Sequence, residues 1–149
     1  MTPRRLLERI LQGLGFPRDG NYRGLRGRGQ QWEREAARRL EAEGYTIRAR
    51  NFRARAGEID VIAEENGTLC FIEVKGRSGP GYGTPAEAVT LEKQRRLFRA
   101  AEEYLVRERL GAPPCRFDVV TVDAGEGGVS IAILRNAFEE PAPRASRRR

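Results

Sequence analysis

The segment from Gly57 to Lys75 constrains the fold of this chain more than any other part of the sequence. It reads GEIDVIAEENGTLCFIEVK, in which two runs with alternating apolar residues flank the dipeptide Asn66-Gly67. This dipeptide favours a two-residue turn with positive φ at both central positions. The pattern therefore predicts a β-hairpin whose strands run from Glu58 to Ala63 and from Leu69 to Lys75.

The turn also predicts the register of this hairpin. With Asn66 and Gly67 central, Asp60 lies opposite Glu73 and Glu58 lies opposite Lys75, with all four side chains on one face. We expect the other face to be buried against the rest of the domain, because it is apolar. That face carries Ile59, Val61, Ala63, Cys70, Ile72 and Val74.

The pair formed by Asp60 and Glu73 needs an explanation. Directly opposed residues have Cβ atoms about 4.5–5.5 Å apart, so two carboxylates there repel each other unless a cation lies between them. Hard ions such as Mg²⁺ are bound by one or two carboxylates together with water and phosphate oxygens. Lys75 would then stabilise an attacking hydroxide or the charge on phosphorus. The alternative is a surface hairpin with a charged exposed face.

Lysine usage favours the chemical interpretation. The chain has 26 Arg and two Lys, and one of the two is Lys75. Arginine is a planar fork that stays protonated, whereas lysine is a compact charge with a tunable pKa. The chain has no His, so a hydrolytic reaction would depend on carboxylates, lysine or metal-bound water.

The positive charge of the chain is concentrated at its ends. Residues 1–28 carry a net charge of +5 and residues 139–149 carry +2, while residues 29–138 have 17 basic and 17 acidic side chains. Basic arms favour sequence-independent binding of a polyanion, although they could serve solubility alone. A further cluster precedes the hairpin and comprises Arg48, Arg50, Arg53 and Arg55. The charge pattern therefore favours nucleic acid, most of all DNA, as the partner.

Glu33 is a second carboxylate in an unusual place. Residues Gln30 to Glu43 predict a helix that ends at Gly44, and Glu33 lies at the centre of its apolar stripe. A carboxylate on a buried face requires a partner. Either the helix is phased differently, or Glu33 pairs with an Arg, or it points at the hairpin site as a third carboxylate.

The remaining elements complete one α/β domain. Tyr45 to Phe52 predicts a first strand, and a long helix is expected from about Thr84 to Leu110, with a break at Thr90. Further strands are expected at Arg116 to Val122 and Val129 to Leu134. Within the helix, Gln94 is either a core amide bonded to the backbone or a group that reaches the substrate, and Lys93 precedes it.

Three regions follow from this pattern. Residues 1–28 form a basic arm with a short amphipathic helix and a Gly/Arg linker, residues 29–138 form the domain, and residues 139–149 form a disordered basic tail. No apolar run is long enough to span a membrane, and the first residues lack the pattern of a signal peptide. We therefore expect a cytoplasmic protein.

The order helix, strand, hairpin, long helix, strand resembles the PD-(D/E)xK nuclease core, with Asp60 on one arm of the hairpin and Glu73-x-Lys75 on the other. A closer resemblance extends from about Gly29 to Phe138. The residues that carry it are Glu33 with Ala36, Ala37 and Leu40; Gly44-Tyr45; Arg50-Asn51-Phe52; Gly57-Glu58-Ile59-Asp60; Phe71-Ile72-Glu73-Val74-Lys75 with Arg77; Gly83-Thr84-Pro85 with Glu87-Ala88-Val89; Lys93; and Arg116-Phe117-Asp118-Val119-Val120. With these residues the chain looks like the YraN family, uncharacterised bacterial proteins with distant similarity to archaeal Holliday-junction resolvases. Trp32 is a departure, because the family usually has a small residue there.

The resemblance implies a restriction-endonuclease-like fold, with a mixed sheet of about five strands flanked by helices in the order α-β-β-β-α-β. It implies Asp60 and Glu73 as ligands of Mg²⁺ or Mn²⁺, Glu33 as an auxiliary ligand and Lys75 as the catalytic lysine. Glu58 is expected to assist this group. Residues expected to contact nucleic acid are Arg50, Arg53, Arg55, Arg77, Lys93 and Gln94.

The function expected from these features is that of a Mg²⁺-dependent endodeoxyribonuclease acting on branched or structured DNA. The alternative is a nucleic-acid-binding module that keeps the nuclease fold without turnover. A weaker alternative is a subunit that docks on a partner through its N-terminal helix. Junction resolvases of this fold act as symmetric dimers, which makes a homodimer a further expectation.

Overall fold

The computed structural model describes residues 28–77, 89–125 and 127–140. The expected N-terminal helix, the basic tail beyond residue 140 and the start of the long helix at Thr84 lie outside these ranges. The elements are α2 (Arg28–Ala42), β1 (Thr46–Arg53), β2 (Glu58–Glu65), β3 (Thr68–Arg77), α3 (Leu91–Arg107), β4 (Cys115–Gly125) and β5 (Gly128–Phe138). The expected α/β class with a five-stranded sheet is confirmed.

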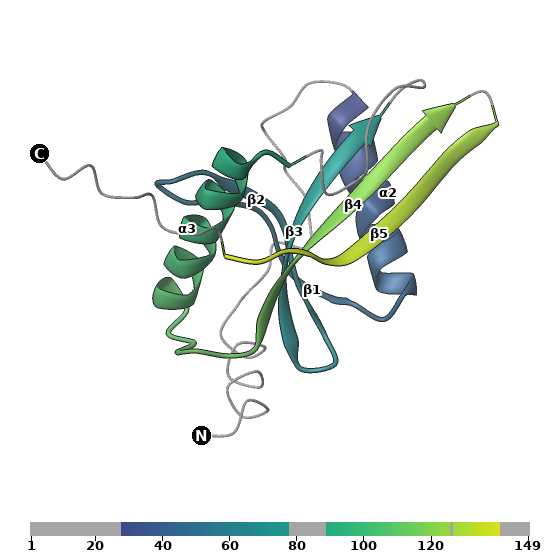
Figure 1. Ribbon diagram of the computed structural model, residues 1–149. Helices are drawn as coiled ribbons and strands as arrows, with labels where there is room; N and C mark the ends of the chain where they lie inside the picture. Colours follow the sequence, from purple (N-terminus) through teal and green to yellow (C-terminus); the bar gives the residue numbers. More distant parts are fainter. Residues whose placement is uncertain (1–27, 78–88, 126, 141–149) are drawn as a thin grey trace, which may run out of the picture.

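The five strands lie in the sheet in the same order as in the sequence, β1-β2-β3-β4-β5. β3 and β4 are parallel, whereas the other neighbours are antiparallel. A parallel pair requires a crossover connection, and α3 lies in the chain between these two strands. α2 and α3 cover opposite faces of the sheet (Figure 1).

The hairpin of β2 and β3 forms as the sequence predicts. Asn66 has φ of 51° and Gly67 has φ of 81°, which is the pair of positive values that the two-residue turn requires. Glu65 lies opposite Thr68, and Val61 lies opposite Ile72. The local preference of the turn therefore fixes the register of this pair of strands.

The prediction that Ile59 shares a buried face with Val61 is wrong. Val61 packs in the cluster on the α2 side of the sheet, while Ile59 packs with Ile62 in the cluster on the α3 side. The regular alternation of β2 is thus interrupted at Asp60. The face predicted to be charged also becomes apolar towards the turn, where Ile62 and Phe71 are buried beneath α3.

Arg48 does not belong to an exposed basic cluster, contrary to expectation. The register between β1 and β2 shifts between Ile47 and Ala49, which leaves Arg48 as the extra residue of a β-bulge. Arg48 is 5% exposed, and its side chain forms an ion pair with Glu64. The bulge explains why the prediction for Arg48 was wrong. The alternating pattern of the strand predicts that the Arg48 side chain faces solvent, but the extra residue of the bulge turns it inward.

α2 ends where the sequence predicts, and the reason is local. Gly44 has φ of 99°, a left-handed value that glycine adopts without strain. The Tyr45 N–H donates to the Leu40 carbonyl at 3.0 Å, and the Gly44 N–H donates to the Glu41 carbonyl at 3.1 Å. These bonds satisfy the last carbonyls of the helix and direct the chain into β1.

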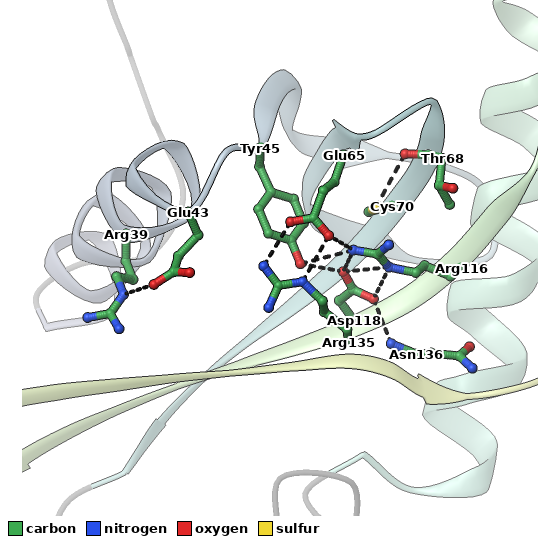
Figure 2. Close-up of polar contacts among 10 residues, drawn as sticks. All are labelled: Arg39, Glu43, Tyr45, Glu65, Thr68, Cys70, Arg116, Asp118, Arg135 and Asn136. Carbon is green, nitrogen blue, oxygen red and sulfur yellow. Dashed lines mark hydrogen bonds and ion pairs between the residues drawn. The ribbon is translucent and has the colours of Figure 1, made fainter.

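A buried polar network lies at the turn end of the hairpin (Figure 2). Asp118 on β4 is 0% exposed. Its carboxylate accepts hydrogen bonds from Arg116 Nε at 3.0 Å, from the Tyr45 hydroxyl at 2.9 Å and from the Asn136 N–H at 2.8 Å. Three elements, β4, β5 and the chain after α2, are therefore joined through one carboxylate.

Glu65 extends this network at the end of β2. Its carboxylate accepts from Arg116 at 2.6 Å and from two nitrogens of Arg135 at 2.8 Å each. The hydrogen bonds from Arg135 and Arg116 lower the pKa of Glu65 to about 2, even though burial opposes the shift. Fully paired buried charges of this kind stabilise one arrangement of the strands.

Among the described residues, neither helix has the length and apolar character needed to cross a membrane.

Candidate active site

The ladder between β2 and β3 runs from Glu65 opposite Thr68 to Val61 opposite Ile72. Beyond that point β2 remains paired with β1 as far as Glu58, and β3 remains paired with β4. Asp60 is the next residue of β2, and its Oδ2 accepts a hydrogen bond from the Val74 N–H at 2.8 Å. A side-chain carboxyl group thus takes the place of a backbone acceptor at the end of the ladder.

Asp60 and Glu73 meet here, as the register predicts. Burial, the charge of Glu73 and a hydrogen bond between the two side chains together raise the pKa of Asp60 to about 8, against the opposing effect of the Val74 N–H. The side chain of Glu73 is 5% exposed. At neutral pH and without a cation, the pair therefore retains a proton that neither residue would hold in water.

Both lysines of the chain contact Glu73. Lys75 Nζ lies 3.6 Å from Glu73 Oε1, and Lys93 Nζ lies 3.5 Å from the same oxygen. Lys75 comes from β3, two residues after Glu73, whereas Lys93 comes from the first turn of α3. The sequence placed Lys75 beside the carboxylates, whereas it predicted Lys93 only as a contact to nucleic acid.

Glu33 and Glu58 are held together by Asn51, a residue of the family resemblance for which no role was predicted. The side-chain amide of Asn51, oriented so that its nitrogen faces the two acids, donates to Glu58 Oε1 at 3.0 Å and to Glu33 Oε2 at 3.2 Å. Asn51 has φ of 49°, a left-handed value that Asn tolerates better than most residues. The signal for this role was weak, because the contact joins three separate elements.

Burial is the main cause of the raised pKa of Glu33, which the Asn51 hydrogen bond opposes and the charge of Glu58 increases. Ala36, Ala37 and Leu40 are buried on the same stripe of α2. The predicted phase of the helix is therefore confirmed, and the partner of its carboxylate is an amide rather than an Arg.

Only one pair of carboxylates in this group, that of Asp60 and Glu73, is suited to bind a hard divalent cation. Asp60 and Glu73 offer carboxylate oxygens whose mutual repulsion a cation would relieve. In the part of the chain that the structure describes, no three Asp, Glu or Cys side chains converge closely enough to hold a metal ion. Glu33 influences the pair electrostatically, because its charge raises the pKa of Asp60.

The other expected nucleic-acid contacts are spread around this group. The charge of Arg50 lowers the pKa of Glu33, which places Arg50 near the site. Arg53 and Arg55 are exposed, and the Arg55 backbone N–H donates to Glu103 at 2.8 Å. Gln94 Nε2 donates to the Val89 carbonyl at 3.0 Å, which is the backbone-bonded alternative for this amide.

Arg77 pairs through its backbone with β4, opposite Asp123. Its side chain lies outside the part of the chain that the structure describes.

Residues 32–122 match the family described as "Uncharacterised protein family UPF0102". The chain belongs to this family, the YraN family. The matched region of the UPF0102 family contains every candidate site residue from Glu33 to Lys93 and excludes both basic arms.

Three UPF0102 relatives align with this chain over most of their own length. The protein of Symbiobacterium thermophilum is 54% identical over 111 residues, which is 74% of this chain and 94% of the relative. That of Lachnoclostridium phytofermentans is 49% identical over 108 residues, covering 72% and 88%. That of Desulfosudis oleivorans is 45% identical over 111 residues, covering 74% and 89%.

In this UPF0102 protein we expect Asn51→Asp to lower the free energy of unfolding by about 2–3 kcal/mol, because two carboxylates lose their donor and gain a negative neighbour. Urea denaturation at pH 7.5 would measure the change. Asn66→Asp is the matched control, since Asn66 also has positive φ (51°) but is exposed in the turn. Equal losses in the two variants would contradict the role assigned to Asn51.

Trp32 packs against β3 next to Lys75. A Cβ added at Gly76 would lie 1.6 Å from Trp32 Cε3, so the indole ring rests directly on this glycine. The absence of a side chain at Gly76 therefore lets the start of α2, and with it Glu33, approach β3.

Gly76→Ala should displace Trp32 and destabilise the domain by about 1–3 kcal/mol. Trp32 is the one tryptophan of the chain, so its emission spectrum reports the displacement. Gly127→Ala is the control, because a Cβ there would meet nothing within 4 Å. Adding Trp32→Ala to Gly76→Ala should remove the clash; unchanged emission and stability in Gly76→Ala would refute the packing argument.

Proposed function

We propose that this protein is a divalent-metal-dependent endonuclease that hydrolyses phosphodiester bonds in DNA, with branched or structured DNA as its preferred substrate. The observation that carries the proposal is the pair of half-buried Asp60 and buried Glu73, with both lysines of the chain in contact with Glu73. A pair of carboxyl groups held against repulsion is costly, and it becomes favourable when a cation binds. The arrangement of elements also agrees with the PD-(D/E)xK core.

Each residue has a role in this proposal. Asp60 and Glu73 would hold Mg²⁺ or Mn²⁺, and Glu33 would act on this pair through its charge rather than by direct coordination. When bound, the metal would make a water more acidic and neutralise charge on the scissile phosphate. The Val74 N–H orients the Asp60 carboxyl group, and Asn51 orients Glu33 and Glu58. Lys75 orients the attacking water.

The charge distribution supports DNA as the substrate. The ends of the chain carry net charges of +5 and +2, and exposed Arg53 and Arg55 lie close in sequence to the hairpin. Such contacts bind phosphates without reading sequence. Preference for branched DNA rests on the resemblance to archaeal junction resolvases, and a symmetric dimer would bring two sites to paired strands.

The test compares wild type with Lys75→Ala on labelled four-way junction, flap, duplex and single-stranded DNA, each with Mg²⁺, Mn²⁺ or EDTA. We expect metal-dependent cleavage, strongest on the branched forms, that disappears in Lys75→Ala. Arg38→Gln controls for loss of one positive charge, because Arg38 lies exposed on α2. If wild type binds all four DNAs without cutting any, the non-catalytic binding module is the better description.

A further inference from the structure

Lys93 and Lys75 are the two lysines among 28 basic residues, and they converge on one carboxylate oxygen. They are 18 positions apart in the sequence and come from different elements, β3 and α3. Everywhere else in the chain a positive charge is supplied by Arg. The shared property of the two positions is thus a compact, mobile ammonium group beside Glu73.

The position of Lys93 is unfavourable for helix stability. It lies in the first turn of α3, where the partial positive charge of the helix disfavours a cation. Thr90 Oγ1 accepts the Lys93 N–H at 3.2 Å and so fixes the backbone of this turn. In contrast, Arg96 and Arg107 on the same helix form exposed ion pairs with acids one turn away.

The side chains of Lys75 and Lys93 contact Glu73 and are also partly exposed to solvent. The side chain of Glu73 is 5% exposed, whereas those of Lys75 and Lys93 are 36% and 37% exposed. Glu73 supplies one negative charge for two positive groups, which leaves unbalanced positive charge facing outward. An anion at this surface, such as a phosphate oxygen, could contact both lysines.

We propose that Lys93 is a second catalytic lysine, which contacts a non-bridging oxygen of the scissile phosphate while Lys75 acts at the attacking water. This proposal rests on the proposed nuclease function. The water oxygen forms a bond to phosphorus and the bond to the leaving sugar oxygen breaks. The proton of the water passes to solvent, and the leaving oxygen takes a proton from solvent. The ammonium group of Lys93 stabilises the added negative charge.

Single-turnover cleavage at saturating DNA tests this role, because it removes differences in affinity. We expect Lys93→Ala to lower the cleavage rate about 10²-fold, the usual effect of removing one group that stabilises transition-state charge. Lys93→Arg should retain part of the rate. Arg96→Gln is the matched control, since it removes a cation from the same helix away from Glu73, and it should cleave like wild type.

DNA affinity in EDTA separates catalysis from simple binding. Loss of one phosphate contact in Lys93→Ala should weaken binding only a few-fold. If Lys93→Ala instead loses affinity and keeps the wild-type rate at saturation, Lys93 is an anchoring residue and the proposal is wrong.

Mn²⁺ titration without DNA gives a readout independent of cleavage. Lys93→Ala should bind Mn²⁺ at least as tightly as wild type, because Lys93 no longer competes for Glu73 Oε1. Lost Mn²⁺ binding in this variant would make Lys93 a support of the carboxylates and overturn the proposal.

The two proposals can fail separately. Cleavage by Lys93→Ala at the wild-type rate, with Lys75→Ala inactive, removes Lys93 from the mechanism and leaves the nuclease intact. Absence of cleavage by wild type on all four DNA forms overturns both.

Discussion

Asp118→Ala is expected to lower the free energy of unfolding by about 3–5 kcal/mol, the usual effect of breaking a buried ion pair by removing one partner. The change leaves Arg116, the Tyr45 hydroxyl and the Asn136 N–H without their shared acceptor. A loss of this size is a large part of the stability of a domain. Urea denaturation followed by far-UV circular dichroism would measure it.

An exposed ion pair provides the control for this prediction. Arg39 on α2 donates to Glu43 at 3.0 Å, and both side chains are at least 40% exposed. Arg39→Gln should cost less than about 1 kcal/mol, because solvent screens such pairs. Asp118→Asn keeps the shape of the side chain and one acceptor oxygen. Its loss in free energy of unfolding should therefore lie between those of Asp118→Ala and Arg39→Gln. If Asp118→Ala were no more damaging than Arg39→Gln, the network around Asp118 would not stabilise the sheet.

Asp60→Asn is expected to abolish cleavage and to stabilise the metal-free protein. The asparagine oxygen can still accept the Val74 N–H, and its NH₂ can donate to Glu73 at any pH, whereas the wild-type carboxyl groups repel each other once their proton is lost near pH 8. The proposed DNA cleavage should fall about 10³-fold or more, because the metal would lose one of its carboxylate ligands. The free energy of unfolding at pH 8 with EDTA should rise by about 2–4 kcal/mol.

The stabilisation by Asp60→Asn should depend on pH. The pKa of Asp60 is 3.8 ordinarily and about 8 in the folded protein, so the folded state binds a proton that the unfolded state releases between these values. The contribution of Asp60 to the free energy of unfolding of wild type is therefore most favourable below about pH 4, and it is lost as the pH rises towards 8. The advantage of the variant should grow over the same interval.

Urea denaturation at pH 5, 6.5 and 8 in EDTA would measure this dependence. Asp123→Asn, an exposed acid on β4, is the control and should show a flat difference. A variant that is less stable than wild type at pH 8 would mean that the Asp60 and Glu73 pair carries no strain to relieve. Such stability gained at the cost of function is expected where a site holds like charges together.

Several features of the site depend on the tertiary structure. Lys93 reaches Glu73 only because α3 docks with its first turn over the end of β3, and no periodicity in the sequence encodes that placement. Asn51 joins Glu33 and Glu58 across three elements. Arg48 turns inward because of a bulge, although its strand pattern favours the surface.

Local preferences of a few neighbouring residues account for the turns and the strand register of this protein. Asn66 and Gly67 favour one turn, the turn fixes one register, and the register brings Asp60 to Glu73; Gly44 likewise ends α2 at a defined residue. Backbone preferences act over a few residues, so they can be predicted from residues that are adjacent in the sequence. The docking of the helices decided which side chains meet across the sheet, because burial and charge pairing act between residues such as Tyr45 and Asp118, which are 73 positions apart.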